Sequence, residues 1–102
     1  MRERSESLAG IITPEMGKTL TAARAEVEKC AATLDWIASN GPAILADEPV
    51  SVENDDRVHI SHLPVGSILA VMPWNFLLWQ VIRAFGPNML SGNEAVWAKK
   101  VS

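Results

Sequence analysis

The amide side chain of Asn75 is the group that this sequence holds most firmly in a position to do chemistry. An apolar run ends just before it at Pro73, and proline has a fixed φ and no N–H to donate, so a strand must stop there. The large ring of Trp74 can anchor the turn in a core. A carboxamide fixed at such a turn can donate a hydrogen bond to a developing alkoxide, which is the task of an oxyanion hole in carbonyl chemistry.

The same side chain has a second use open to it. Helical sequence begins directly after Asn75, and asparagine is a common helix N-cap, whose oxygen accepts from the N–H groups two or three residues on. The cap uses the oxygen of the carboxamide, whereas the oxyanion hole uses its nitrogen. The two uses therefore compete for one side chain.

The single cysteine does not fit the role of a nucleophile. Cys30 lies upstream of Asn75 in a helical pattern, and Val27, Ala31 and Leu34 fall on the same apolar face. Free cysteine is among the most buried residue types, and no neighbour in sequence favours a thiolate. We expect Cys30 to be a small buried side chain.

The two histidines do not form a metal site. His59 and His62 are three apart in a segment that resembles a strand, so their side chains should point to opposite faces. Metal ligands must converge on one point. No metal is expected.

The rest of the chain supplies the elements that must position Asn75. Alanine-rich and amphipathic segments favour helices, β-branched runs favour strands, and glycine and proline mark the boundaries. The sequence predicts a first helix over about 2–13, followed by a break at Pro14 and Gly17, and a second helix over about 19–39, which Thr19 or Thr21 caps and Asn40, Gly41 and Pro42 end. A hairpin is expected over about 50–62, and a strand buried on both faces over 67–72. A helix over 77–85, ended by Gly86 and Pro87, should then lead to a parallel strand over 95–98.

Composition bounds the function. The 102 residues suffice for one domain at most, and a net charge of -3 from 9 basic and 12 acidic residues suggests neither nucleic acid nor an anionic membrane surface as a partner. One cysteine excludes an internal disulfide and fits a reducing compartment, so we expect the cytoplasm. The apolar stretch over 63–90 is interrupted by Pro64, Pro73 and Arg83, so no membrane span is expected.

Spaced motifs along the chain match the pattern of one known family. They are Pro64, Gly66, Ile68–Val71, Pro73–Phe76, Gly92 and Asn93, with Glu15–Lys18, Ala22, Ala23, Glu26, Val27 and Ala31 upstream. In these motifs the chain resembles the aldehyde dehydrogenase family over about residues 4–93. The run Leu78–Arg83 is most similar to the succinate-semialdehyde dehydrogenase branch.

The resemblance implies an α/β fold: part of a doubly wound, Rossmann-like cofactor domain over residues 1–102, with two N-terminal helices and a β-hairpin, as a truncated form of the family fold. In the family a cysteine thiolate attacks an aldehyde, an asparagine amide and a backbone N–H hold the oxyanion, hydride passes to NAD or NADP, and a glutamate-activated water releases the acid. Asn75 matches that asparagine. The family's nucleophile, general base and pyrophosphate-binding glycine turn lie further along its chain than residue 102.

The same resemblance implies further site residues. Arg83 matches an arginine that pairs with the distal carboxylate of the semialdehyde substrate, and its alternative is a snorkelling surface arginine. The family's ribose-binding lysine falls on Ala98, and Lys99 is a weaker candidate because a one-residue shift in a strand turns the side chain to the other face. The cofactor channel would be lined by Val71, Met72, Pro73 and Trp74, for which ordinary core packing is the alternative.

The chain also departs from the family pattern. The family usually has proline where this chain has Leu77, which loosens the turn that aims Asn75. Glu94, Trp97 and the segment 99–102 fit the pattern poorly. We therefore expect a truncated enzyme, without a complete active site, that does not oxidise aldehydes alone.

In the family a hairpin of this kind belongs to the projection that mediates subunit association. The expected partners are therefore a second copy of the chain or a full-length homologue, reached through the unpaired strand edges of the hairpin. Two alternatives to a truncated enzyme stay open: a non-enzymatic interaction fragment that docks on such a homologue, and an unselected gene remnant.

Overall fold

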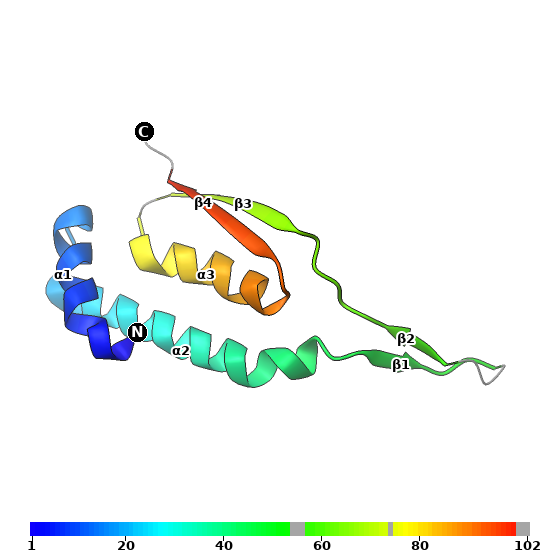
Figure 1. Ribbon diagram of the computed structural model, residues 1–102. Coiled ribbons are helices and arrows are strands. Elements are labelled where there is room, and N and C mark those ends of the chain that lie inside the picture. The colour runs from blue at the N-terminus through cyan, green and yellow to red at the C-terminus, as the bar shows by residue number, and fades with distance from the viewer. Residues whose placement is uncertain (54–56, 74, 100–102) are drawn as a thin grey trace.

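The computed structural model describes residues 1–53, 57–73 and 75–99. Within these residues, three helices and four strands follow a short 3-10 turn, and the predicted α/β fold is confirmed (Figure 1). The elements are η1 (Arg2–Arg4), α1 (Ser5–Met16), α2 (Leu20–Ile44), β1 (Glu48–Val50), β2 (Val58–Ile60), β3 (Ser67–Met72), α3 (Leu77–Leu90) and β4 (Glu94–Lys99).

Helices α1 and α2 form a helical pair joined by a tight turn. The predicted break at Pro14 is wrong, because α1 runs through Pro14 to Met16. The next residue, Gly17, has a φ of 65°, the left-handed conformation that glycine adopts without cost. Thr19 caps α2, as predicted, because its Oγ1 accepts from the N–H of Ala22 at 3.2 Å. The small core consists of four buried side chains of these helices, Ala9, Ile12, Ala23 and Val27. The partly buried Leu77 and Leu78 of α3 pack against it.

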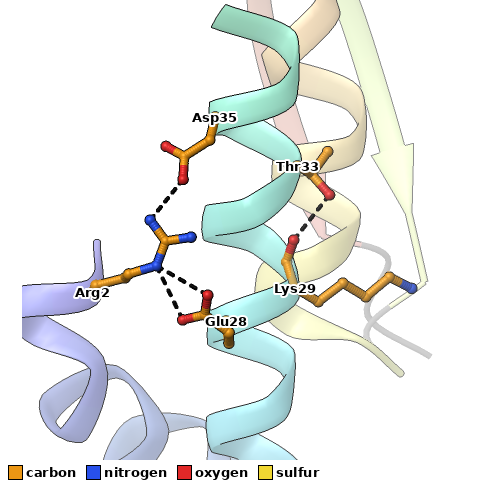
Figure 2. A network of polar contacts seen from close by, with 5 residues as sticks. All are labelled: Arg2, Glu28, Lys29, Thr33 and Asp35. Atoms are coloured by element: carbon orange, nitrogen blue, oxygen red, sulfur yellow. Dashed lines mark hydrogen bonds and ion pairs between the residues drawn. The ribbon is translucent and has the colours of Figure 1, made fainter. Parts of the chain in front are cut away.

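Exposed ion pairs also join η1 and α1 to α2. In Figure 2 the guanidinium of Arg2 lies between Glu28 and Asp35 of α2, with Nε 3.0 Å from Glu28 Oε1 and Nη1 2.6 Å from Asp35 Oδ2. Arg24 makes two bonds of 2.8 Å to the carboxylate of Glu6, which lowers the pKa of that carboxyl. Because these side chains face solvent, the pairs fix geometry more than they add stability.

Two further predicted helix ends are wrong. Helix α2 continues through Gly41 and Pro42 to Ile44, and α3 continues through Gly86 and Pro87 to Leu90. The helical conformation before a proline is disfavoured partly by a clash with the preceding Cβ, which glycine lacks. Both glycines also lie where α2 and α3 cross, since a Cβ at Gly41 would overlap Leu90 and one at Gly86 would lie 2.7 Å from Ile37 Cδ1. The packing of α2 against α3 therefore extends each helix beyond the glycine and proline at which it was predicted to end.

Strands β3 and β4 pair in parallel, and α3 connects them, as predicted. In Figure 1, α3 lies between this strand pair and α2. The prediction that β3 is buried on both faces is wrong for this chain, because exposure alternates along it and Leu69 and Val71 are 65% and 57% exposed. Helix α3 covers one face of the pair only.

The predicted hairpin is present as β1 and β2, which pair antiparallel with Pro49 opposite His59. Its turn includes residues 54–56, which lie outside the described residues. Every residue of the two strands is exposed, and the hairpin projects away from the helices (Figure 1). Within the described part of the chain, no helix is long and apolar enough to cross a membrane.

Candidate active site

Asn75 lies at the carboxyl end of the parallel strand pair. Strand β3 ends at Met72, opposite the last residue of β4, and the chain then turns through Pro73 into α3. Ligands of α/β sheets bind outside the carboxyl ends of the strands, so this edge is where a site is expected. The side chain of Asn75 is exposed there. Trp74, the expected anchor of the turn, lies outside the described residues.

A carboxylate from another helix caps α3. Phe76 occupies the N-cap position, and its apolar side chain makes no cap bond. Instead, Glu26 of α2 accepts from the backbone N–H groups of Leu78 and Trp79, both 3.0 Å from its Oε1. These are the second and third residues of the helix, the ones an N-cap side chain normally serves. The alternative that Asn75 is the N-cap is therefore wrong.

Lys18 holds the other oxygen of the same carboxylate. Its Nζ donates to Glu26 Oε2, and the Glu26 side chain is only 3% exposed. The same ammonium lies 3.8 Å from the ring centroid of Phe76, within range of a cation–π contact. One buried ion pair thus touches both sides of the junction between Phe76 and α3.

A cavity opens beside this ion pair, between α2 and the first turn of α3. Its volume is about 420 Å³, and Lys29 lies at its edge with Nζ 3.9 Å from the Trp79 ring centroid. Figure 2 shows Lys29 extending from the side of α2 opposite Arg2. The lining residues are Lys18, Ala22, Ala25, Glu26, Lys29, Phe76 and Trp79.

The other predicted site residues are spread along the same edge and helix. Val71 and Pro73 are exposed at the end of β3, and Met72 is half-buried. Arg83 is exposed on α3, four residues beyond Trp79 and so on the same helical face. Lys99 ends β4, where its backbone pairs with Met72, and its side chain lies outside the described part.

Cys30 is fully buried, as the sequence predicts. It lies on α2, and burial, reinforced by the charge of Glu26, raises the pKa of its thiol to about 11. A thiol that is protonated near neutral pH and has no access to solvent cannot attack an aldehyde. Among the described residues, no cluster of three metal-ligating side chains occurs.

Two motif residues, Gly92 and Asn93, hold the opposite edge of the strand pair. The Asn93 Oδ1 accepts from the N–H groups of Val65 and Gly66 at 2.7 and 3.2 Å, just before β3 begins. Gly92 has a φ of 77° in the turn from α3 to β4. Their role is to hold the start of β3 against the loop after α3.

Trp97, which was expected from the sequence to fit the family pattern poorly, has a buried polar atom with no partner among the described residues. Its indole Nε1 is buried and makes no hydrogen bond with any described residue. An unpaired buried donor costs on the order of 1–3 kcal/mol.

Glu26 is the residue that motif reasoning undervalued. Its position in the sequence carried a signal, because it lies three residues after Ala23 and four before Cys30, on the apolar face of α2. A carboxylate on a buried face needs partners. Those partners, Leu78 and Trp79, are 52 and 53 residues away, so spacing along α2 could not name them.

Comparison with known proteins gives one consistent match. The model of the aldehyde dehydrogenase family matches residues 1–100. The chain is 55% identical over 93 residues to the succinate semialdehyde dehydrogenase [NAD(P)+] Sad of Escherichia coli (strain K12), and the matched region covers 91% of this chain and 20% of that protein. It is 41% identical over 98 residues to the succinate-semialdehyde dehydrogenase [NADP(+)] of Mycobacterium avium (strain 104), covering 94% and 21%.

Solved structures agree with the sequence match. The succinic semialdehyde dehydrogenase of Streptococcus pyogenes, in complex with NADP+, superposes with a TM-score of 0.89 at 34% identity, over 97% of this chain and 22% of that one. The chain thus spans about a fifth of the length of the curated relatives it matches.

Proposed function

Because the chain belongs to the aldehyde dehydrogenase family, we propose that it supplies the oxyanion-binding turn of an NAD(P)-dependent active site that oxidises succinate semialdehyde. The observation that carries the proposal is the exposed Asn75 carboxamide at the carboxyl end of β3 and β4, with the helix cap supplied by Glu26. Such an amide can donate to the oxygen of an aldehyde as it becomes an alkoxide.

The end of the strand pair fits one wall of a dinucleotide channel. Val71 and Pro73 are exposed there, and the carboxyl ends of both strands meet at this edge. NAD or NADP, when bound, accepts the hydride of the substrate. We propose that Val71, Met72, Pro73 and Trp74 line this wall, and Lys99 is the weaker candidate for the ribose.

Arg83 is proposed to bind the distal carboxylate of the semialdehyde. Its guanidinium is exposed on α3, on the face that also carries Trp79, and a guanidinium can bind a carboxylate through two parallel hydrogen bonds. The relatives named above act on a substrate with such a carboxylate, which supports the assignment.

We propose that the chain alone does not complete the reaction. Cys30 is its single cysteine, and it is buried with a protonated thiol. The purified chain, mixed with succinate semialdehyde and NAD or NADP, should give no increase in nicotinamide absorbance. Thiol-dependent reduction of the cofactor by the isolated chain would contradict this part of the proposal.

Reconstitution tests the oxyanion role directly. The remaining segment of the Escherichia coli relative, supplied as a second polypeptide, should restore aldehyde oxidation when mixed with this chain. Asn75→Ala should then lower kcat by about 100-fold or more, the usual cost of one oxyanion donor. The control is Asn40→Ala, which removes an exposed amide bonded to the Trp36 carbonyl at 2.9 Å, far along α2.

Two results would overturn the proposal in this assay. Equal activity of the Asn75→Ala and wild-type mixtures would remove the oxyanion role. Arg83→Met should raise KM for succinate semialdehyde but not for an uncharged aldehyde of similar length, and an equal effect on both would remove the carboxylate role.

A second function is favoured by the exposed apolar surface. Leu69, Val71 and Val96 are more than half exposed on the uncovered face of β3 and β4, and Val58 and Ile60 are exposed on the hairpin. Such surface supports a non-enzymatic fragment that docks on a full-length homologue through this face and the hairpin of residues 50–62. Co-purification with that homologue tests it. For both functions we propose the cytoplasm, which a free cysteine fits.

A further inference from the structure

We propose that Glu26 and Lys18 are positioning residues for the oxyanion amide: Glu26 caps α3 from α2, and this leaves the Asn75 carboxamide available for substrate. The inference rests on the proposed role of Asn75. It concerns two residues of other elements that touch neither the substrate nor the cofactor in the proposed function. Its evidence is the set of contacts around the first turn of α3.

Helix α3 needs a cap at its N-terminus that the side chain at its own N-cap position cannot supply. The first N–H groups of a helix have no partner inside the helix. Phe76, at the N-cap position, has no acceptor, while the N–H of Gln80 already makes the first intrahelical bond, to the Phe76 carbonyl at 3.0 Å. The N–H groups of Leu78 and Trp79 would be left for the nearest polar side chain.

The nearest polar side chain in sequence is Asn75. An asparagine just before a helix accepts from such N–H groups readily, and its carboxamide would then be held by its oxygen against the helix. Glu26 removes this competition, since both N–H groups lie 3.0 Å from its Oε1. A carboxylate also suits the positive end of the helix dipole better than a neutral amide.

Lys18 holds the Glu26 cap in place. A lone carboxylate with 3% exposure would be costly to bury, and the Lys18 ammonium on its other oxygen supplies the opposite charge. The same ammonium contacts the ring of Phe76, the residue that directly follows Asn75. The pair therefore fixes the chain directly after Asn75, at the Phe76 ring and at the N-terminus of α3.

Stability alone does not account for this pair. A buried ion pair is on average no better for stability than well-packed apolar residues of the same volume. Its neighbours Ala23 and Val27 on α2 are fully buried apolar side chains. What an apolar residue at position 26 could not do is accept from Leu78 and Trp79 in place of Asn75.

Amide hydrogen exchange of the whole chain, measured by NMR, tests the cap. Glu26→Ala should speed exchange at the Leu78 and Trp79 amides by about tenfold or more, the usual size of a lost bond to a charged group. Glu26→Gln keeps an acceptor of the same shape and should recover part of the protection. Glu28→Ala, the matched control on the exposed face of α2, should leave both amides unchanged.

The role toward Asn75 is tested by combining variants. In the wild-type background, Asn75→Ala should leave the protection of Leu78 and Trp79 unchanged, because Glu26 provides the cap. In the Glu26→Ala background, the Asn75 carboxamide resonances should shift as this side chain takes over the cap, and adding Asn75→Ala should lower the protection further. A loss of global stability alone would not move the Asn75 resonances in molecules that stay folded.

Each result decides the inference. Loss of protection with Asn75→Ala alone would show that Asn75 is the cap, and unchanged protection in Glu26→Ala would show that Glu26 is not; either overturns the proposal. If Glu26→Ala does not fold, Glu26→Gln takes its place, and its weaker neutral acceptor should leave the Leu78 and Trp79 amides less protected than in the wild type. The exchange measurements need no catalysis, so failure of the reconstitution assay would overturn the proposed function and leave this result standing on its own.

Discussion

Cys30 is a residue whose environment makes the stability of the chain depend on pH. Burial raises the pKa of its thiol to about 11, whereas a thiol in the unfolded chain ionises near pH 8.5. Between these values the unfolded state binds fewer protons than the folded state, so the free energy of unfolding falls as pH rises. Chemical denaturation at pH 8 and pH 10.5 should show a loss on the order of 1–3 kcal/mol.

The control for this prediction is Cys30→Ala. That variant starts less stable because it loses a small buried group, but its unfolding free energy should fall less steeply over the same pH range. Alkylation of Cys30 by iodoacetamide at neutral pH should be no faster than local or global unfolding. Rapid alkylation of the folded chain, or an equal pH slope in both proteins, would show that the thiol is accessible.

At the scale of single residues, the sequence alone predicted the features that depend only on neighbouring residues in the chain. The position of Asn75 between a strand and a helix follows from the strand, the proline and the helical run around it, and the burial of Cys30 follows from one helical face. Glu26 and Lys18 could not be assigned in this way, because their partners belong to α3 and to the turn before it. A residue pattern predicts which side of a helix is buried, whereas the function of a buried charge depends on the residues of other elements that contact it.

The crossing of α2 and α3 makes an element-scale prediction. Gly86 is buried, and an added Cβ would lie 2.7 Å from Ile37 Cδ1 and 3.5 Å from Leu34 Cδ2. Gly86→Leu should therefore force the helices apart and lower the free energy of unfolding by about 1–3 kcal/mol, the usual cost of overpacking a core. Thermal or urea unfolding measures the change.

Gly10 provides the matched control on α1. It is exposed, and a Cβ there would meet nothing within 4 Å. Because leucine favours helix over glycine, Gly10→Leu should raise the free energy of unfolding by up to about 1 kcal/mol. Similar effects of the two substitutions would mean that the helices do not cross at Gly86 as closely as the structure has them.

Elements were predicted well wherever the local pattern matched the packing. The strand over 67–72, the cap at Thr19 and the parallel strand after α3 are confirmed. The ends of α2 and α3 were wrong because glycine and proline were taken as stop signals, while at Gly41 and Gly86 the absence of a side chain serves the helix crossing. Glycine can end a helix or allow two helices to pack closely, and only the position of the neighbouring helix decides which role it has.

The molecule as a whole is far from a compact domain. Its radius of gyration is 18.1 Å, against about 13 Å for a compact domain of roughly 100 residues. Its accessible surface is 7319 Å², whereas a compact monomer of this mass exposes roughly 5,700 Å². The excess arises from the projecting hairpin and from the strand pair, which has a helix on one face only (Figure 1). No pattern in the sequence predicts this openness, because β3 has the composition of a strand buried on both faces.

The open face of the strand pair should therefore drive association. Leu69 and Val96 are 65% and 59% exposed and lie in register on adjacent strands, so together they form a continuous apolar strip. Wild-type chain at micromolar concentration should sediment as a dimer or larger species. Leu69→Lys combined with Val96→Lys should shift it to the monomer, because each buried lysine would lose its hydration.

The control for this experiment places the same two charges elsewhere. Ile11 and Met89 are 54% and 62% exposed on helices α1 and α3, so Ile11→Lys with Met89→Lys adds equal charge without touching the strip. If the strip is the interface, this variant should associate as the wild type does and should still co-purify with a full-length homologue, whereas the Leu69 and Val96 double variant should do neither. A wild-type chain that is strictly monomeric, or a control that dissociates equally, would show that the strip is not the contact surface.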